Sequence, residues 1–375
     1  MGGGRDLTVA GAADMADIRA KGVKRWRTTA CALAWLLAVG PASAFDESAT
    51  AEEADRESPA EGRELVPMPT LGGNQLWADE LLRHQWRIQR NVVSGRYRLL
   101  DGSNLRHASG TFEQCRAVLD QIQRERNLPP TQGKAVILLH GIGDTRAQMN
   151  RLGRYLEQKG GYEVFNVSYP STRQGIDEHA KGLAAVVDHL EGIEEINFVG
   201  YSLGNLVIRR YLADQLKRGE GKLDPRFKRM VMLGPPNHGS QLATNLGDNK
   251  LFELLLGKSG QELGPLWAWE ESSLATPPFE FGIVAGGCGD GRGFNPLLPG
   301  DDDGVVTVAS TRLPGAADFI VVHALHALLP REPRVHEITL RFLQHGYFIA
   351  PDRRKPLGKA DREEEGEGRG TKDDG

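Results

Sequence analysis

The feature that most constrains the fold is a regular alternation of apolar strands and helical segments that begins at Lys134. Residues 135–139 (AVILL) form an uninterrupted apolar run, which is typical of a central strand covered on both faces. Further strands are expected at 162–169, 196–199, 227–233, 279–285 and 319–322, and helices at 146–159, 176–190, 203–216 and 332–345. This alternation predicts a mostly parallel central sheet with helices on both faces, in one α/β domain over residues 134–350.

The first 44 residues have the three parts of an export signal in the right order. A basic block at 21–27 precedes the uncharged stretch 28–40, and Ala42-Ser43-Ala44 fits a cleavage site before Phe45. We therefore expect a signal peptide at 1–44 and an exported chain, either periplasmic or secreted. If the signal were not cleaved it would act as a membrane anchor, although its apolar run is short for a membrane span.

Three other segments lie outside the α/β domain. Residues 45–64 are acidic with few large apolar side chains, and residues 351–375 are charged and Gly-rich, so both are predicted to be disordered. Residues 65–133 form a small N-terminal extension in which alternating segments flank Ser94-Gly95, as in a β-hairpin, and residues 112–126 have helical spacing. We expect this extension to pack on the main domain, and no chemistry can be assigned to it.

Composition narrows the classes of ligand. The net charge is -4 and there is no long basic run, so nucleic acid is not expected as a partner. Cysteine-rich metal signatures are absent, and neither a metal site nor a cofactor is predicted. After signal removal the chain keeps Cys115 and Cys288, which in an oxidising compartment could pair or could remain free and buried.

The string Gly200-Tyr201-Ser202-Leu203-Gly204 matches the G-x-S-x-G nucleophile elbow of serine hydrolases. A string this short can arise from composition alone in a chain with 46 glycines. Its context is more specific, because a predicted strand ends at the motif and a predicted helix begins there. We expect Ser202 to be a nucleophile, with Gly200 and Gly204 required because side chains there would collide at the tight turn.

A second motif, His140-Gly141-Ile142-Gly143-Asp144, follows the strand at 135–139. An oxyanion hole needs backbone N–H groups directed at the developing negative charge. We expect these from Leu203, at the positive end of a helix dipole, and from Ile142 in the Gly-flanked loop. His140 is expected to brace this loop. The alternative is an ordinary Gly-rich turn.

Together, HGIGD, GYSLGN and LGPPNHGS resemble the bacterial lipase and esterase branch of the α/β-hydrolase superfamily. The resemblance covers roughly residues 134–347, excludes the extension, and departs by one residue from the commoner spelling around His238. It implies an α/β-hydrolase fold, a serine nucleophile and ester chemistry. His238 precedes the acid in the chain, so we expect it to be structural or to line the site.

The resemblance also implies where the acid and the base lie, since they follow the serine in the order acid, then histidine. Asp303 of DDDGVV matches the acid, with Asp301 and Asp302 as alternatives or as solvated turn residues. These three carboxylates lack the spacing of a calcium loop. His326 of HALL matches the base, and His323 is the second candidate.

The predicted activity is hydrolysis of carboxylic esters, with a lipid or acyl ester as substrate. Residues 242–269 are apolar but discontinuous, which fits either an acyl-chain surface or lid, or a helix packed on the sheet. Association with a membrane surface is also expected for a protein that acts on lipid esters. Two alternatives stay open: an acyltransferase or thioesterase on the same fold, and a catalytically silent binding protein.

Overall fold

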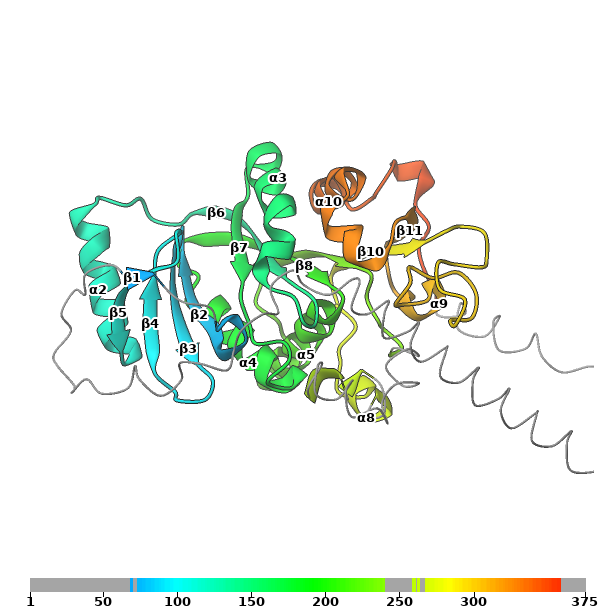
Figure 1. Ribbon diagram of the computed structural model, residues 1–375. Helices are drawn as coiled ribbons and strands as arrows, with labels where there is room; N and C mark the ends of the chain where they lie inside the picture. Colours follow the sequence, from blue (N-terminus) through cyan, green and yellow to red (C-terminus); the bar gives the residue numbers. More distant parts are fainter. Residues whose placement is uncertain (1–67, 70–72, 240–257, 261, 264–266, 359–375) are drawn as a thin grey trace, which may run out of the picture. The chain divides into compact units, whose positions relative to one another are not determined.

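The computed structural model describes residues 68–69, 73–239, 258–260, 262–263 and 267–358. Its larger sheet has six strands in the order β11-β10-β9-β8-β6-β7, and every neighbouring pair is parallel (Figure 1). The strands are β6 (Gly133–Leu139), β7 (Glu163–Val167), β8 (Ile193–Tyr201), β9 (Phe227–Leu233), β10 (Glu280–Gly287) and β11 (Asp318–His323). The predicted parallel sheet is therefore confirmed.

Helices cover both faces of this sheet. Figure 1 shows α3 (Asn150–Gly160) and α10 (Pro333–His345) above it, and α4 (Ile176–Asp188) and α5 (Leu203–Arg218) below it. The main core cluster joins alternate strand residues to α3 and α10, and its members include Val136, Val199, Leu152 and Phe342. Residues 135–139 of β6 are all buried, which explains why the strand is apolar without alternation.

The predicted elements agree with the structure apart from their ends. The helix expected at 146–159 begins with a 3-10 turn, η2 (Arg146–Met149), before α3 starts. Thr145 caps that turn by accepting a hydrogen bond from the Ala147 N–H at 3.4 Å. β8 is longer than expected and reaches Tyr201, directly before Ser202.

The N-terminal extension forms a second, five-stranded antiparallel sheet with the order β1-β5-β4-β3-β2. Its strands are β1 (Met68–Pro69), β2 (Trp77–Arg83), β3 (Trp86–Asn91), β4 (Tyr97–Leu100) and β5 (Leu105–Gly110), followed by α2 (Phe112–Glu125). The predicted hairpin corresponds to β3 and β4, and the predicted helix to α2. One sheet face packs on α2 through Leu81, Ile88, Leu99 and Leu119.

Asp79 of β2 joins this sheet to the end of β7. Its carboxylate accepts a hydrogen bond from the Ser168 N–H at 2.7 Å, and its own N–H donates to the Ser168 carbonyl at 2.9 Å. Asp79 is only 1% exposed. The extension thus packs on the α/β domain through a buried, hydrogen-bonded carboxylate.

The chain end differs from the prediction of disorder from residue 351. Residues 351–358 are described and pack on the α/β domain, where Leu357 exchanges backbone hydrogen bonds with Gly315 and Ala316 at 2.8 and 3.0 Å. The buried Leu357 side chain supplies the apolar contact that the charged composition of this segment conceals. The rest of the predicted tail, together with the signal peptide and the linker at 45–64, lies outside the described residues.

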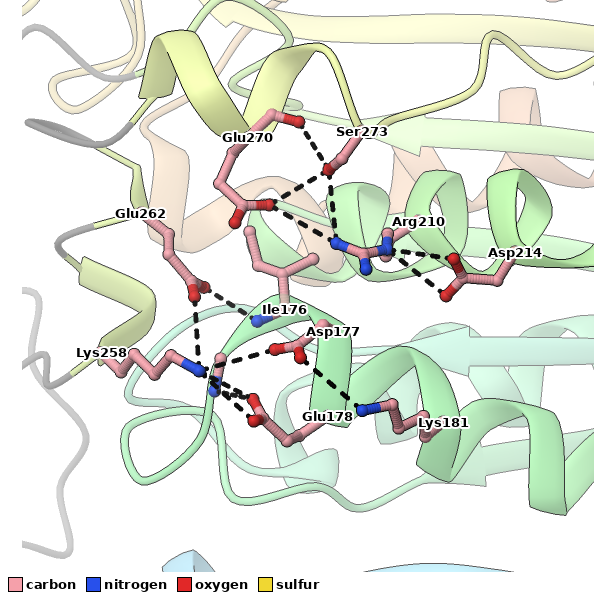
Figure 2. A network of polar contacts seen from close by, with 11 residues as sticks. Ile176, Asp177, Glu178, Lys181, Arg210, Asp214, Lys258, Glu262, Glu270 and Ser273 are labelled. Atoms are coloured by element: carbon pink, nitrogen blue, oxygen red, sulfur yellow. Dashed lines mark hydrogen bonds and ion pairs between the residues drawn. The ribbon is translucent and has the colours of Figure 1, made fainter. Parts of the chain in front are cut away.

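Cys115 and Cys288 are both free, so the disulfide considered from the sequence is not formed. Within the described part of the chain, no helix is both long and apolar enough to cross a membrane. Most of the predicted acyl-chain segment at 242–269 lies outside the described residues. Lys258 and Glu262 of this segment contact α4, and Glu270, directly after the segment, contacts Arg210 of α5, in one polar network (Figure 2).

Candidate active site

Ser202 lies on the sharp turn between β8 and α5, where the sequence motif predicted it. Its backbone has φ 51° and ψ -120°, a conformation that L-residues rarely adopt. Its side chain is near the surface but only 7% of the residue is exposed. A strained strand–turn–helix of this kind projects the hydroxyl beyond the carboxyl end of the sheet.

The two motif glycines are required by the close packing of this turn. A Cβ at Gly204 would lie 2.5 Å from the Leu139 carbonyl oxygen and 2.8 Å from that of His140. A Cβ at Gly200 would lie 2.7 Å from the Asn205 backbone nitrogen. These distances are shorter than van der Waals contact, so side chains at either position would overlap the neighbouring backbone.

Asn205 fixes the backbone of the turn, a role that was not predicted. Its Nδ2 donates to the Ser202 carbonyl at 3.0 Å and to the Leu233 carbonyl at 3.2 Å. The Leu233 carbonyl also accepts the Ser202 N–H at 2.9 Å. The fully buried Asn205 therefore ties the elbow to the end of β9. The only sequence signal was its place directly after the motif.

The structure brings Ser202, His326 and Asp303 together from three separate segments. His326 Nε2 lies 3.0 Å from Ser202 Oγ, and His326 Nδ1 lies 2.6 Å from Asp303 Oδ2. Since the carboxylate can only accept, Nδ1–H donates to Asp303 and Nε2 is left to accept the serine proton. His326 is 6% exposed and Asp303 is fully buried, so both bonds are shielded from water.

Asp303 is held by backbone amides as well as by His326. Its Oδ1 accepts the N–H groups of Val305 at 3.0 Å and Val306 at 2.7 Å, and its carbonyl accepts the His326 N–H at 2.8 Å. The other two aspartates turn away: Asp301 accepts from the N–H groups of Cys288 and Gly289, and Asp302 from those of Asn295 and Gly304. Asp301 and Asp302 therefore stabilise loops instead of contacting His326.

The other histidines lie apart from this arrangement. His323 is exposed at the end of β11 and its ring packs 5.2 Å from that of Phe294, with no hydrogen bond to Ser202 or Asp303 among the described contacts. His238 lies 3.1 Å from Glu271 Oε1. Glu271 belongs to α8 (Trp267–Glu271), so His238 fastens this helix to the loop after β9.

The loop that follows β6 is braced on several sides. His140 is buried, its Nδ1–H donates to the Gly141 carbonyl at 2.8 Å, and its ring stacks on Tyr169 at 4.2 Å. The Tyr169 hydroxyl donates to the His140 carbonyl, and the Gly143 N–H donates to Ser171 Oγ at 3.1 Å. Burial lowers the pKa of His140 to about 4, so its ring is neutral at pH 7.

This loop passes directly beside the nucleophile. A Cβ at Gly141 would lie 3.2 Å from Ser202 Cβ and 3.0 Å from the Tyr201 ring. Leu203 is the first residue of α5, where a backbone N–H has no acceptor within the helix. Ile142 and Leu203 thus lie on the two segments that flank Ser202, as an oxyanion hole requires.

Asp144, the last residue of the loop motif, was not singled out from the sequence. Burial raises the pKa of its carboxyl to about 6, and the nearby Arg331 and the His326 ring oppose that rise. The Tyr201 hydroxyl approaches the same region and donates to the His326 carbonyl at 3.2 Å. Only the fold reveals these neighbours, since an aspartate in a Gly-rich loop is usually solvated.

Among the described residues, one group has the composition of a metal site. Ligand atoms of Cys288, Asp290 and Asp301 lie within 4.8 Å of one another. Both Asp301 carboxylate oxygens already accept backbone N–H bonds, and Asp290 and Cys288 lie on an open loop. This group is separate from the pair formed by Ser202 and His326.

Comparisons with known proteins give structural similarity only. No protein-family model matches the chain, and no curated protein matches its sequence. The mature form of lipase BlEst2 from Bacillus licheniformis is similar at 18% identity, over 58% of this chain and 93% of that one, with a TM-score of 0.43. Phospholipase PlaB from Legionella pneumophila is similar at 19% identity, over 57% of this chain and 60% of that one, with a TM-score of 0.43. The metagenomic carboxyl esterase MGS0156 is similar at 17% identity, over 54% of this chain and 67% of that one, with a TM-score of 0.39.

The fold follows from the chain's own architecture. The helix-covered parallel sheet supports a strained serine between β8 and α5, and a Gly-rich loop after β6 lies beside that serine. The acid and histidine segments follow in chain order at the same edge of the sheet. The domain therefore has the α/β-hydrolase fold predicted from its sequence motifs.

Proposed function

We propose that this protein is a serine hydrolase that cleaves carboxylic esters through Ser202, His326 and Asp303. The observation that carries the proposal is the continuous hydrogen-bonded chain from Ser202 Oγ through both nitrogens of His326 to Asp303 Oδ2. Such a chain activates a hydroxyl that is otherwise a poor nucleophile at neutral pH. The strained backbone of Ser202 adds support, because strain of this kind is commonly found at functional sites.

In the proposed mechanism, Ser202 Oγ attacks the ester carbonyl carbon while its proton passes to His326 Nε2. Asp303 holds the imidazole in the tautomer that accepts this proton and stabilises the resulting cation. The tetrahedral intermediate collapses when His326 returns the proton to the leaving alcohol, and an acyl-enzyme remains. Water then attacks the acyl carbon, again with His326 as base, and releases the acid.

The oxyanion would be stabilised by the N–H groups of Ile142 and Leu203. The supporting observations are the close approach of Gly141 to Ser202 and the position of Leu203 at the first turn of α5. The bracing of the loop by His140 and Tyr169 allows these donors to act without reorganisation. Neither a metal ion nor a cofactor has a role in this mechanism.

The proposed substrates are lipid or acyl esters, and the proposed location is outside the cytoplasm. Export rests on the signal-like residues 1–44, and substrate class rests on the resemblance of three motifs to lipases and esterases. Association with a membrane surface would bring such a protein to its substrate.

A panel of p-nitrophenyl esters of increasing acyl length tests the proposal. We expect turnover by the purified protein, a fall of at least about 10⁴-fold in kcat/KM in Ser202→Ala, and a comparable fall in His326→Ala. His323→Ala is the matched control and is expected to stay within about twofold, because His323 contacts neither Ser202 nor Asp303. The acyl length with the highest kcat/KM separates a lipase from a short-chain esterase.

Two outcomes would contradict parts of this assignment. Full activity in Ser202→Ala would exclude Ser202 as the nucleophile. If His323→Ala were inactive and His326→Ala active, the base would be His323 and not His326. Faster product release with added alcohol or thiol acceptors would favour the acyltransferase alternative, and a higher kcat/KM on acyl thioesters than on the matching oxygen esters would favour the thioesterase alternative. No turnover on any ester would favour a silent binding protein.

A further inference from the structure

A second site lies between the two sheets, on the far side of the loop that follows β6. It is a cavity of about 400 Å³. One wall comes from the N-terminal sheet, with Arg87, Gln89 and Arg98 among its residues, and the opposite wall from Asp144, Arg146 and the end of β7. A volume of this size accommodates a small ligand.

Strand periodicity explains why the sheet presents polar groups to this cavity. Along β3 and β4, Ile88 and Leu99 face α2 and enter its apolar cluster. Residues next to them in sequence point to the opposite face, where Gln89 and Arg98 are directly paired. In an ordinary two-layer packing that opposite face would be apolar or exposed to water, but Arg87 is only 5% exposed and Arg98 only 8%.

Among the described residues the buried arginines form no ion pair with a carboxylate, although the negative charge of Asp79 favours the cations of Arg98 and Arg146. Arg98 donates from Nε and Nη2 to the neutral Gln89 side chain at 2.9 and 2.8 Å, and its head lies 3.9 Å from the centre of the Trp77 ring. Asp79 is the closest acid, but its oxygens already accept from Gln89 and from the Ser168 N–H. The Arg87 Nε is buried and has no hydrogen-bond partner among the described residues.

Arg146 adds a third guanidinium from the opposite wall. Its Nη2 donates to Asn104 Oδ1 at 3.2 Å, another neutral acceptor. Burial is the largest cause that lowers the pKa of both Arg98 and Arg146 to about 10, and the positive charge of Arg87 lowers both further. Three like charges therefore share one small space, and among the described residues that line it Asp144 is the one carboxylate.

Burying cations without matching anions is costly, and a bound anion would remove much of that cost. A guanidinium presents a planar fork of donors that matches the oxygens of a phosphate group. Three guanidiniums, with the side chains of Ser103 and Asn104 at the mouth, suit a group with two charges and several acceptor oxygens better than a single carboxylate.

We propose that this cavity is a binding site for a phosphate group, with Arg87, Arg98 and Arg146 as its principal ligands. The phosphate could belong to a small soluble ester or to a lipid headgroup, since both present the same oxygens. His140 and Tyr169 also line the cavity, and their opposite sides brace the loop beside Ser202. The site therefore gives a function to the extension, and it does not depend on the proposed ester hydrolysis.

The test is calorimetric titration of the full-length Ser202→Ala protein with inorganic phosphate and with glycerol 3-phosphate, at constant ionic strength set with chloride. We expect saturable binding that Arg87→Gln weakens at least tenfold. Arg124→Gln, at an exposed position on α2, makes the same charge change outside the cavity and is expected to leave binding unchanged. Because the nucleophile is absent, the result is independent of whether the protein hydrolyses esters.

Lack of binding by the parent protein at millimolar phosphate, or equal weakening by Arg87→Gln and Arg124→Gln, would overturn the proposal. If Arg87→Gln does not fold, Arg146→Gln on the opposite wall decides in the same way. Flotation with phosphatidylcholine vesicles, with and without phosphatidic acid, then identifies the source. Binding that requires phosphatidic acid and Arg87 indicates a lipid phosphate, and binding of glycerol 3-phosphate without vesicle binding indicates a soluble ester.

Discussion

At Ser202 the backbone is held in a conformation that costs about 1–3 kcal/mol for a residue with a side chain. Asn205 and Leu233 maintain it through hydrogen bonds on both sides of the turn. The arrangement holds Ser202 Oγ 3.0 Å from His326 Nε2. In the proposed ester hydrolysis, this preorganisation would lower the activation barrier.

The tight turn makes a clear prediction at Gly204. In Gly204→Ala the new methyl group would overlap the Leu139 and His140 carbonyl oxygens, so we expect a loss of about 1–3 kcal/mol in unfolding free energy and a displaced loop after β6. Urea denaturation measures the stability change.

Gly182→Ala on α4 is the matched control. No atom lies within 4 Å of a Cβ at Gly182, and alanine favours helix, so we expect stability to rise by about 0.5–1 kcal/mol. If Gly204→Ala were as well tolerated as Gly182→Ala, the close packing of the elbow would be wrong.

Sequence patterns placed the residues that are adjacent to motifs and missed those that depend on long-range contacts. Ser202, Asp303 and His326 each lie in a short recognisable string, and the structure brings them within hydrogen-bonding distance. Asp144 and Tyr201 are within the same strings, but their proximity to His326 arises from how three loops meet. No local sequence pattern predicts which loops will lie next to one another.

At the scale of elements, the residues after β9 are attached to α4 by a buried carboxyl (Figure 2). Glu262 is 4% exposed, accepts the Ile176 N–H at the start of α4 at 2.8 Å, and lies 3.9 Å from Lys258 Nζ. Burial raises the pKa of Glu262 to about 7, and the negative charge of Glu270 adds to the rise.

This raised pKa predicts a pH-dependent attachment. The neutral carboxyl is favoured in the folded protein, so its contribution to stability is full below about pH 4.5 and is lost as the pH rises through about 7. Glu262→Gln removes this titration and can still accept the Ile176 N–H. We expect the melting temperature of Glu262→Gln relative to the parent to be about 2–4 °C higher at pH 8 than at pH 5.

Glu337→Gln, at an exposed position on α10, is the control and should show the same difference from the parent at both pH values. A Glu262→Gln protein whose melting temperature tracks the parent from pH 5 to pH 8 would show that Glu262 is not buried as described.

The elements that were predicted well are those whose pattern of apolar residues matches their burial, on one face or on both. β9 was placed to the residue because its apolar run matches its burial, and α10 was placed to within one residue because one face is apolar. β2 was missed because Asp79 and Arg83 interrupt its pattern, yet both are buried in polar contacts. In the sequence a buried polar residue cannot be distinguished from an exposed one, so hydrophobic periodicity cannot locate such a strand.

At the scale of the whole described chain, Asp79 couples the extension to the α/β domain. In Asp79→Ala the Ser168 N–H and the Gln89 amide would lose their buried acceptor, and the arginines of the cavity would lose their nearest anion. We expect a loss of about 2–5 kcal/mol in unfolding free energy, measured by urea denaturation. Asp352→Ala, at an exposed position, should change stability by less than about 0.5 kcal/mol.

Separate unfolding transitions for the extension and the α/β domain in the parent protein would contradict this coupling. A single transition that splits in two only in Asp79→Ala would support it, because the buried contact would then be what makes the two sheets unfold together.

The central claim is that Ser202 is an activated nucleophile, and covalent labelling tests it most directly. The full-length protein is incubated with a fluorophosphonate, and the adduct is located by peptide mass spectrometry. We predict one adduct per chain, on the peptide that contains Ser202, absent in Ser202→Ala and formed at least about 10³-fold more slowly in His326→Ala. No adduct, or an adduct that persists at another residue in Ser202→Ala, would contradict the account.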